Sequence, residues 1–176
     1  KTTIMTRKSI YWFAIMCFIV FGCNESDDGS YADPITLYEK IDGEWNLMNL
    51  TMVDNVAKAA GLEPSEQNLS TWFNYDNFKI RFNVDERNQP TTYEVVGDVP
   101  PLFALSGYWN LSNSFQQTDG AATRIYLYSD AQKTLLTDEL RLTSVPGSNG
   151  EMEIQLVRTS NGTPFVSYVF KLSTTN

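Results

Sequence analysis

The sequence predicts an all-β domain of about eight antiparallel strands, preceded by an export segment. From residue 78 onward, apolar side chains recur at every second position, which is the spacing of strands with one buried face. The 176 residues are enough for one such domain. This succession either closes into an up-and-down barrel or folds into a two-sheet sandwich, and the residue pattern leaves both open. Turn signals separate the segments at Asp119-Gly120, Pro146-Gly147-Ser148-Asn149-Gly150 and Asn161-Gly162.

The first element is a secretory signal. Two basic residues precede an uncharged apolar run over residues 10–21. As a helix this run is about 18 Å long, too short for a hydrocarbon core of roughly 30 Å. Its end, Val20-Phe21-Gly22-Cys23, resembles a bacterial lipobox, in which a peptidase cuts before a lipidated cysteine. We therefore expect a lipoprotein signal peptide over residues 1–22 and lipidation at Cys23, which anchors the protein in a membrane. The alternatives are a plain secretory signal and lipidation at Cys17.

Residues 23–32 are expected to form a lipidated, flexible tether, because the polar and acidic stretch from Asn24 to Ser30 has nothing to bury. The stretch also resembles the acidic export tract that sends some Gram-negative lipoproteins to the cell surface. We expect an outer-membrane lipoprotein in the cell envelope, exposed at the surface or otherwise facing the periplasm. No disulfide is expected, because cleavage removes Cys17 and lipidation consumes Cys23.

The domain begins with a short helix and a long strand. Asp33-Pro34 is a helix start signal that predicts a helix over residues 34–40. A long strand opens at Gly43, and its apolar phase shifts between Leu47 and Met48, which predicts a bulge. Residues 54–76 break the strand pattern and predict two short helices or an ordered lid.

Seven further strands follow by the same reasoning. The clearest is over residues 78–84, where four apolar side chains alternate with polar ones. A strand over 91–97 ends before Pro100-Pro101, because proline cannot donate to a ladder. The others are expected over residues 106–112, 123–129, 134–145, 152–156 and 166–172.

Gly43-Glu44-Trp45, coming after a short helix and before about eight strands, resembles the start of the calycin group. The match is to the lipocalin-like domains of bacterial lipoproteins of unknown function. The resemblance implies an eight-stranded antiparallel up-and-down barrel over residues 33–176, with short helices before strand 1 and between strands 1 and 2. It also implies a barrel floor at Gly43 and Trp45, with Lys171 or Arg158 stacked on the indole.

A second segment, Gly107-Tyr108-Trp109-Asn110-Leu111, repeats the pattern of Gly43-Glu44-Trp45-Asn46-Leu47. Two matched strand starts would place two indoles at corresponding positions in the fold. Chance similarity over five residues is the alternative.

Composition excludes several functions. The net charge of -8 would repel nucleic acid. The chain has no histidine, which excludes Ser-His-Asp and Cys-His catalysis and metal sites that use histidine. We expect no cofactor, no metal and no catalytic residue. Glu151 and Glu153 lie two apart on a strand face and would suit a carboxylate-dependent glycan hydrolase, but a solvated strand face accounts for them more simply.

Aromatic residues near the predicted loops are the candidate binding residues, because their flat faces suit sugar rings and lipid chains. They are Trp72, Phe73, Tyr108 and Trp109. The expected function is the binding of a small apolar molecule or a glycan in an open barrel mouth. The alternative is an accessory subunit that docks to an outer-membrane protein.

Overall fold

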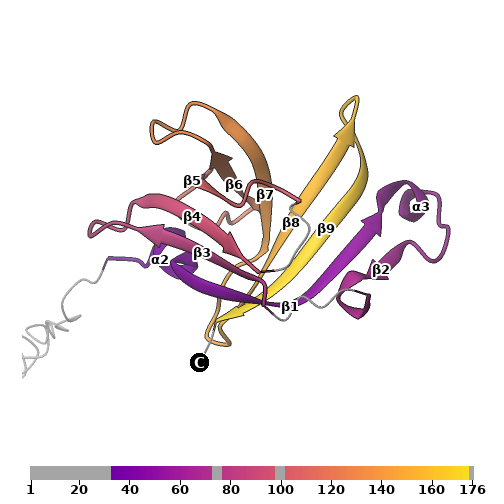
Figure 1. Cartoon of the computed structure of the whole chain (residues 1–176), viewed down its shortest axis with the longest axis horizontal. Helices are drawn as coiled ribbons and strands as arrows, with labels where there is room; N and C mark the ends of the chain where they lie inside the picture. Colours follow the sequence, from indigo (N-terminus) through magenta and orange to yellow (C-terminus); the bar gives the residue numbers. More distant parts are fainter. Residues whose placement is uncertain (1–32, 73–76, 98–101, 175–176) are drawn as a thin grey trace, which may run out of the picture. The chain divides into compact units, whose positions relative to one another are not determined.

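The computed structural model describes residues 33–72, 77–97 and 102–174. Within them, eight antiparallel strands in meander order close into a barrel (Figure 1). The barrel closes because β1 (Gly43–Asp54) pairs with both β3 (Lys79–Val84) and β9 (Thr163–Thr174). The predicted antiparallel barrel is confirmed, and the sandwich alternative is excluded. The remaining strands of the barrel are β4 (Pro90–Val96), β5 (Ser106–Leu111), β6 (Thr123–Tyr128), β7 (Leu136–Ser144) and β8 (Glu151–Ser160).

The helix before the barrel is α2 (Leu37–Ile41), which begins later than predicted. Thr36, and not Asp33, is its N-cap: the Thr36 hydroxyl accepts from the Glu39 N–H, and the Glu39 carboxylate accepts from the Thr36 N–H. This capping box satisfies two backbone donors at once, which explains the choice of start. The Leu37 N–H donates to the Ser114 carbonyl, so α2 reaches from the start of β1 to the loop between β5 and β6.

The segment between β1 and β3 contains two short helices, as predicted, and one short strand that was not. The helices are α3 (Asn55–Ala59), capped by Asp54, and the 3-10 helix η1 (Leu69–Thr71). The strand is β2 (Glu66–Asn68), which pairs with the end of β1. Its three side chains are all polar, so apolar alternation gave no signal for it.

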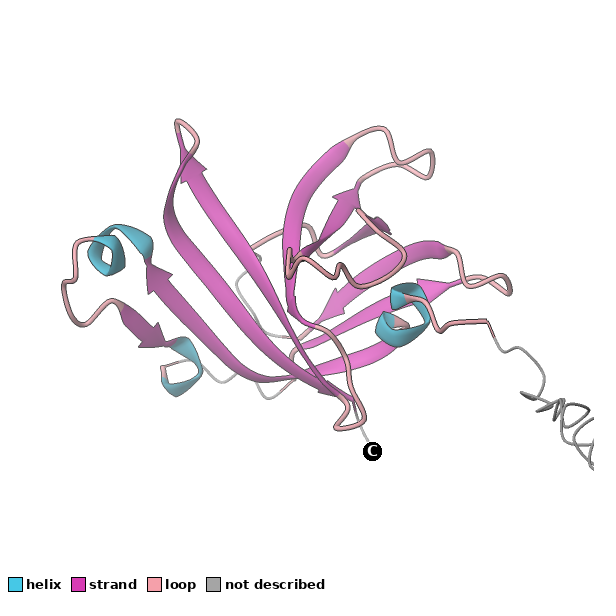
Figure 2. Cartoon of the chain, turned by 180° about the vertical axis from the view of Figure 1, so that it is seen from behind, coloured by secondary structure: helices cyan, strands magenta, loops and turns pink. Residues whose placement is uncertain are grey.

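The register of β1 against β9 shifts between Leu47 and Asn49, where the sequence predicted a bulge. Beyond the bulge, β1, β8 and β9 continue past the closed part of the barrel (Figure 1). β7 pairs with β8 only as far as Leu140 and Leu156. Beyond Leu156, β8 remains paired with β9, and on the other side the end of β1 is paired with β2. Figure 2 shows α3 and β2 beside the end of β1. We call this extension the ledge; it comprises residues 50–54, 66–68, 157–160 and 163–168.

The turn between β8 and β9 has the geometry that the sequence predicted. Asn161 and Gly162 both have positive φ, at 50° and 79°. A two-residue type I′ hairpin requires positive φ at both central positions, and Asn-Gly is its preferred pair.

Large side chains fill the interior of the described barrel. Phe103, from the loop between β4 and β5, enters this core and meets Phe170 edge to face, with ring centroids 5.9 Å apart. The Tyr93 hydroxyl donates to the Ala104 carbonyl, which ties the same loop to the barrel. The strands contribute the following buried side chains to this cluster: Trp45, Leu50, Ile80, Phe82, Tyr93, Trp109, Leu111, Ile125, Leu127, Leu140, Leu142, Met152, Ile154, Leu156, Phe170 and Leu172.

The two indoles of the repeated sequence motif lie at the end of the barrel covered by α2. The Trp45 indole N–H donates to the Ile41 carbonyl at the end of α2, over 2.8 Å. Tyr38 of α2 packs edge to face on Trp109, with ring centroids 5.8 Å apart. Both indoles are buried, although β1 and β5 run in opposite directions. The two motifs therefore place their indoles at the same end of the barrel, but from strands of opposite direction.

Candidate functional site

A groove of about 510 Å³ lies on the outer face of β3, β4 and β5. Strand alternation explains which side chains reach it. On β3 the buried Ile80 and Phe82 point inward, so Arg81 and Asn83 point outward. The same alternation on β4 and β5 sends the following residues to the outer face: Thr92, Glu94, Ser106 and Tyr108.

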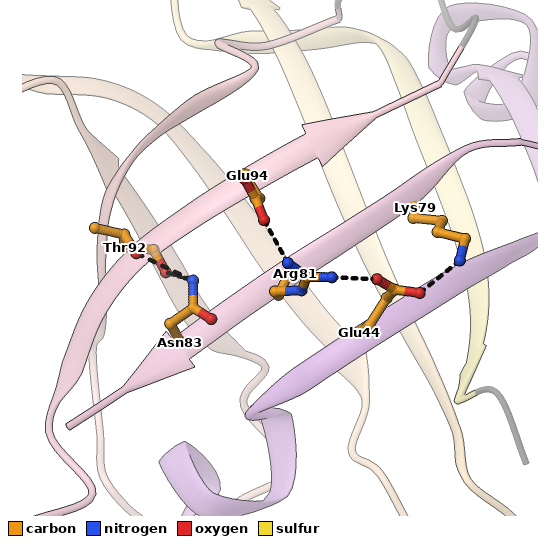
Figure 3. Close-up of polar contacts among 6 residues, drawn as sticks. All are labelled: Glu44, Lys79, Arg81, Asn83, Thr92 and Glu94. Atoms are coloured by element: carbon orange, nitrogen blue, oxygen red, sulfur yellow. Dashed lines mark hydrogen bonds and ion pairs between the residues drawn. The ribbon is translucent and has the colours of Figure 1, made fainter. Parts of the chain in front are cut away.

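An ion-pair network forms one side of the groove (Figure 3). The two carboxylate oxygens of Glu44 lie 2.6 Å from Lys79 Nζ and 2.6 Å from an Arg81 nitrogen, and Arg81 lies 2.7 Å from Glu94. The strand register explains this network, because Arg81 stands directly opposite both Glu44 and Glu94. Hydrogen bonds from Lys79 and then Arg81 lower the pKa of Glu44. With two cations and two anions, the network is electrically balanced.

A row of tyrosines continues from the other side of the groove. Thr92 stands opposite Tyr108, which stands opposite Tyr128, so all three side chains share the outer face. The rings of Tyr126 and Tyr128 lie 6.5 Å apart. Burial, followed by the charges of Tyr126 and Asp130, raises the pKa of Tyr128. Tyr108, Tyr126 and Tyr128 are all partly exposed.

Gly107 lets β5 and β6 come close at the groove. A Cβ at this position would lie 2.3 Å from the Tyr128 carbonyl oxygen, closer than real Cβ atoms come to other atoms. Glycine is therefore required here. The groove wall beside Tyr108 is bare backbone as a result.

The groove combines an aromatic face with fixed polar groups. Asn83 donates from its side-chain amide to the Thr92 hydroxyl over 3.0 Å, and the ion pairs hold Arg81 and Glu94 in place. Such a surface suits a ligand that has both an apolar face and hydroxyl groups. The sequence identified only Tyr108 here. The polar partners were recognisable as outward-facing residues, but nothing in the sequence gave the register that brings them together.

The other predicted binding residues are not in this groove. Trp109 is fully buried in the barrel core, and its indole N–H donates to the Asn83 carbonyl over 2.9 Å, so it does not line this groove. Trp72 is 71% exposed and lines a second hollow of about 500 Å³ beside the ledge, with Met52 and Pro64 among its walls. Phe73 lies outside the described residues.

The floor assigned by the lipocalin-like resemblance is only partly assembled. Trp45 is 1% exposed, and Gly43 begins β1 at the same end of the barrel. Arg158 is at the far end, because it aligns through Val166 with Asp54, nine residues along β1 from Trp45 and so about 30 Å away. There it pairs with Asp138 over 2.9 Å and donates to the Leu102 carbonyl.

Lys171 is also remote from the indole. It is exposed on the outer face, because its neighbours Phe170 and Leu172 point inward. It stands opposite Glu153, which accepts from the Thr143 hydroxyl over 2.8 Å. Glu151 accepts from the Asn149 side chain. The two glutamates thus lie on a hydrogen-bonded outer strand face.

In the part of the chain that the structure describes, no helix has the length and apolar character needed to cross a membrane. Nor do any three His, Cys, Asp or Glu residues in those ranges group together in a way that would hold a metal ion. Cys23, the signal peptide over residues 1–22 and the tether up to residue 32 lie outside the described residues.

Comparison with curated proteins and with solved structures finds no match. A family model described as a domain of unknown function, DUF5004, matches residues 22–173. The matched range covers all the strands of the barrel except the last residue of β9. The chain therefore belongs to the DUF5004 family, and its domain of unknown function is a closed, eight-stranded antiparallel β-barrel.

Proposed function

We propose that this protein is a lipid-anchored binding protein of the cell envelope that holds a neutral glycan in the groove beside Tyr108. One observation carries the proposal: a partly exposed aromatic ring shares a 510 Å³ groove with the side chains of Arg81, Asn83 and Glu94. A sugar ring has an apolar C–H face that packs on an aromatic ring, and hydroxyls that need donors and acceptors around it. The groove offers both on one side of the sheet.

The charges favour an uncharged ligand. Arg81 and Lys79 are neutralised by Glu44 and Glu94, and the chain as a whole carries a net charge of -8. An anionic ligand would meet no uncompensated cation in this network. A purely apolar ligand would cover Asn83 and Thr92 without offering them new partners, which is costly. Of the two ligand classes expected from the sequence, the glycan is therefore preferred.

The proposed site lies outside the barrel, whereas a lipocalin-like protein would carry its ligand inside. The lipocalin-like comparison is supported by the buried Trp45 beneath α2 and by the meander order of the strands. The interior itself is occupied by Trp109, Phe82 and Phe170, and Phe103 enters it from the loop between β4 and β5. A ligand in the interior would have to displace these side chains. The groove needs no such displacement.

The location follows from the sequence. Lipidation at Cys23 would hold the barrel at a membrane, with the acidic tether between them. In an outer-membrane lipoprotein, the barrel would face either the medium or the periplasm. Both compartments contain glycans, so a glycan-binding protein is consistent with either location.

The test is titration calorimetry of the protein, purified from cell envelopes in a detergent without a sugar headgroup, against a panel of neutral oligosaccharides. We expect Tyr108→Ala to weaken binding about tenfold or more, which corresponds to about 1.4 kcal/mol. Trp72→Ala is the matched control, because Trp72 is the most exposed aromatic residue outside the groove in the part of the chain that the structure describes, and we expect this variant to bind normally. The opposite pattern, with binding weakened in Trp72→Ala and unaffected in Tyr108→Ala, would place the ligand in the hollow beside the ledge.

The ledge and the neighbouring residues 55–65 and 69–72 favour a second candidate function, docking to an outer-membrane protein. Trp72 is 71% exposed, and Phe165 on β9 is 45% exposed. Val56 and Leu62, from the same segment as α3, are also exposed, so apolar side chains gather at this end. Exposed aromatic residues are typical anchors of protein interfaces. Cross-linking in intact cells would recover one dominant partner, and Trp72→Ala would abolish that recovery.

A further inference from the structure

We infer that the groove beside Tyr108 is one end of a platform that binds a linear glycan of several sugar units, with Tyr128 and Tyr126 forming the rest of the platform. The inference rests on the proposed function and adds the size and shape of the ligand. Its basis is a row of outward-facing rings that the groove alone does not explain.

The rings are placed by strand register. Tyr108 of β5 and Tyr128 of β6 are directly opposite each other, so they are cross-strand neighbours on one face. Tyr126 is two residues from Tyr128 on the same strand, and their rings lie 6.5 Å apart at 55°. The three rings therefore lie on one face of the sheet, across two neighbouring strands.

This surface begins at the groove. Tyr108 and Ser129 both line the groove, and Ser129 directly follows Tyr128. On its far side, Tyr128 stands opposite Leu136, which is 54% exposed. Tyrosine is a good strand former, which accounts for any one of these rings. It does not account for three neighbouring rings and an exposed leucine on the outer face, where polar side chains are the rule in an antiparallel barrel.

Polar groups lie at both ends of the rings. At one end, Asn83 and Thr92 are hydrogen-bonded to each other. At the other end, Glu139 stands opposite Tyr126 and lies 3.4 Å from Arg124. A chain of sugar units lying across the rings would stack each C–H face on a tyrosine and offer its outer hydroxyls to these side chains.

The platform predicts that affinity increases with chain length. A disaccharide would be held in the groove at Tyr108, and longer chains would also cover Tyr128 and Tyr126, with a measurable gain from stacking on each of these two rings. A groove that binds a single unit would instead show the same affinity for every chain that contains that unit. Chain-length dependence therefore separates the platform from the groove alone.

The experiment titrates the detergent-purified protein with two series of neutral oligosaccharides, maltose to maltohexaose and cellobiose to cellohexaose. For at least one series, we expect affinity to increase about tenfold between the disaccharide and the tetrasaccharide and then to level off. In Tyr128→Ala, this increase should be lost while disaccharide affinity stays within about twofold. Tyr128→Phe keeps the ring and should keep the increase, which guards against a mere folding defect.

The outcomes distinguish the platform from the groove. Binding that depends on Tyr108 but not on chain length, or an increase that survives in Tyr128→Ala, would overturn the platform and leave the proposed function standing. If neither series bound, or if binding did not respond to Tyr108→Ala, the proposed function would be overturned together with the platform.

Discussion

At the scale of the residue, Trp45 shows how a short motif fixes the end of the barrel. Its ring is 1% exposed, and its N–H is satisfied by the Ile41 carbonyl, so both the apolar and the polar parts of the indole are satisfied. The sequence could predict this burial, because Gly43-Glu44-Trp45 opens a strand directly after a helix. It could not predict the partner, because the resemblance offered a basic residue where the structure supplies a backbone carbonyl.

We predict that Trp45→Ala lowers the free energy of unfolding by about 3 to 5 kcal/mol, because it leaves a large cavity under α2. Trp72→Ala removes the same side chain from a 71% exposed position and should change stability by less than about 0.5 kcal/mol. Urea denaturation of both variants checks the pair. A loss below about 1 kcal/mol for Trp45→Ala would contradict the burial of this indole in the barrel core.

At the scale of the element, the loop between β4 and β5 is held to the barrel by contacts from three strands. Tyr93 of β4 donates to the Ala104 carbonyl, Arg158 of β8 donates to the Leu102 carbonyl, and Phe103 packs on Phe170 of β9. The sequence could not predict this closure, because Pro100-Pro101 indicated only where a strand ends. Contacts between a loop and strands far along the chain leave no local pattern.

Tyr93 makes this closure sensitive to alkaline pH. Burial, followed by the charge of Asp138, raises its pKa to about 12, whereas an unfolded tyrosine titrates near about 10. The unfolded chain therefore loses this proton first, so stability is fully present below pH 10 and is lost as the pH rises toward 12. At about 1.4 kcal/mol per pKa unit, the loss is about 2 to 3 kcal/mol.

The control for this prediction is Tyr93→Phe. This variant should be less stable by about 1 kcal/mol at neutral pH, because it loses the hydrogen bond to Ala104. It should also lose less stability than the unmodified protein between pH 10 and 12, since the other tyrosines are common to both. Unfolding curves in urea at several pH values give the comparison. Parallel declines in the two proteins would contradict a buried, protonated Tyr93.

At the scale of the whole molecule, the sequence predicted the architecture far better than the surface. Period-two alternation and turn pairs such as Asn161-Gly162 are local, so the strand order could be read along the chain. The groove joins Arg81, Thr92 and Tyr108 from three strands, and only the register of the sheet brings them together. Register depends on the pairing of the closed barrel, which no single segment encodes.

The proposed anchor and the proposed groove belong to different parts of the chain. We therefore expect that a variant that loses the anchor keeps its affinity for glycan. Cys23 belongs to a local motif that precedes the barrel, whereas the described residues that line the groove lie between Arg81 and Ser129. In cells fed an alkyne-tagged fatty acid, Cys23→Ser should remove the label and release the protein from the membrane fraction. Cys17→Ser should keep the label, because the expected cleavage before Cys23 would remove Cys17. The released Cys23→Ser protein should bind glycan as tightly as the anchored one, since the described residues that line the groove all lie in the barrel. A label that persists in Cys23→Ser would overturn the lipidation site, and a loss of glycan affinity in the released protein would show that the membrane takes part in binding.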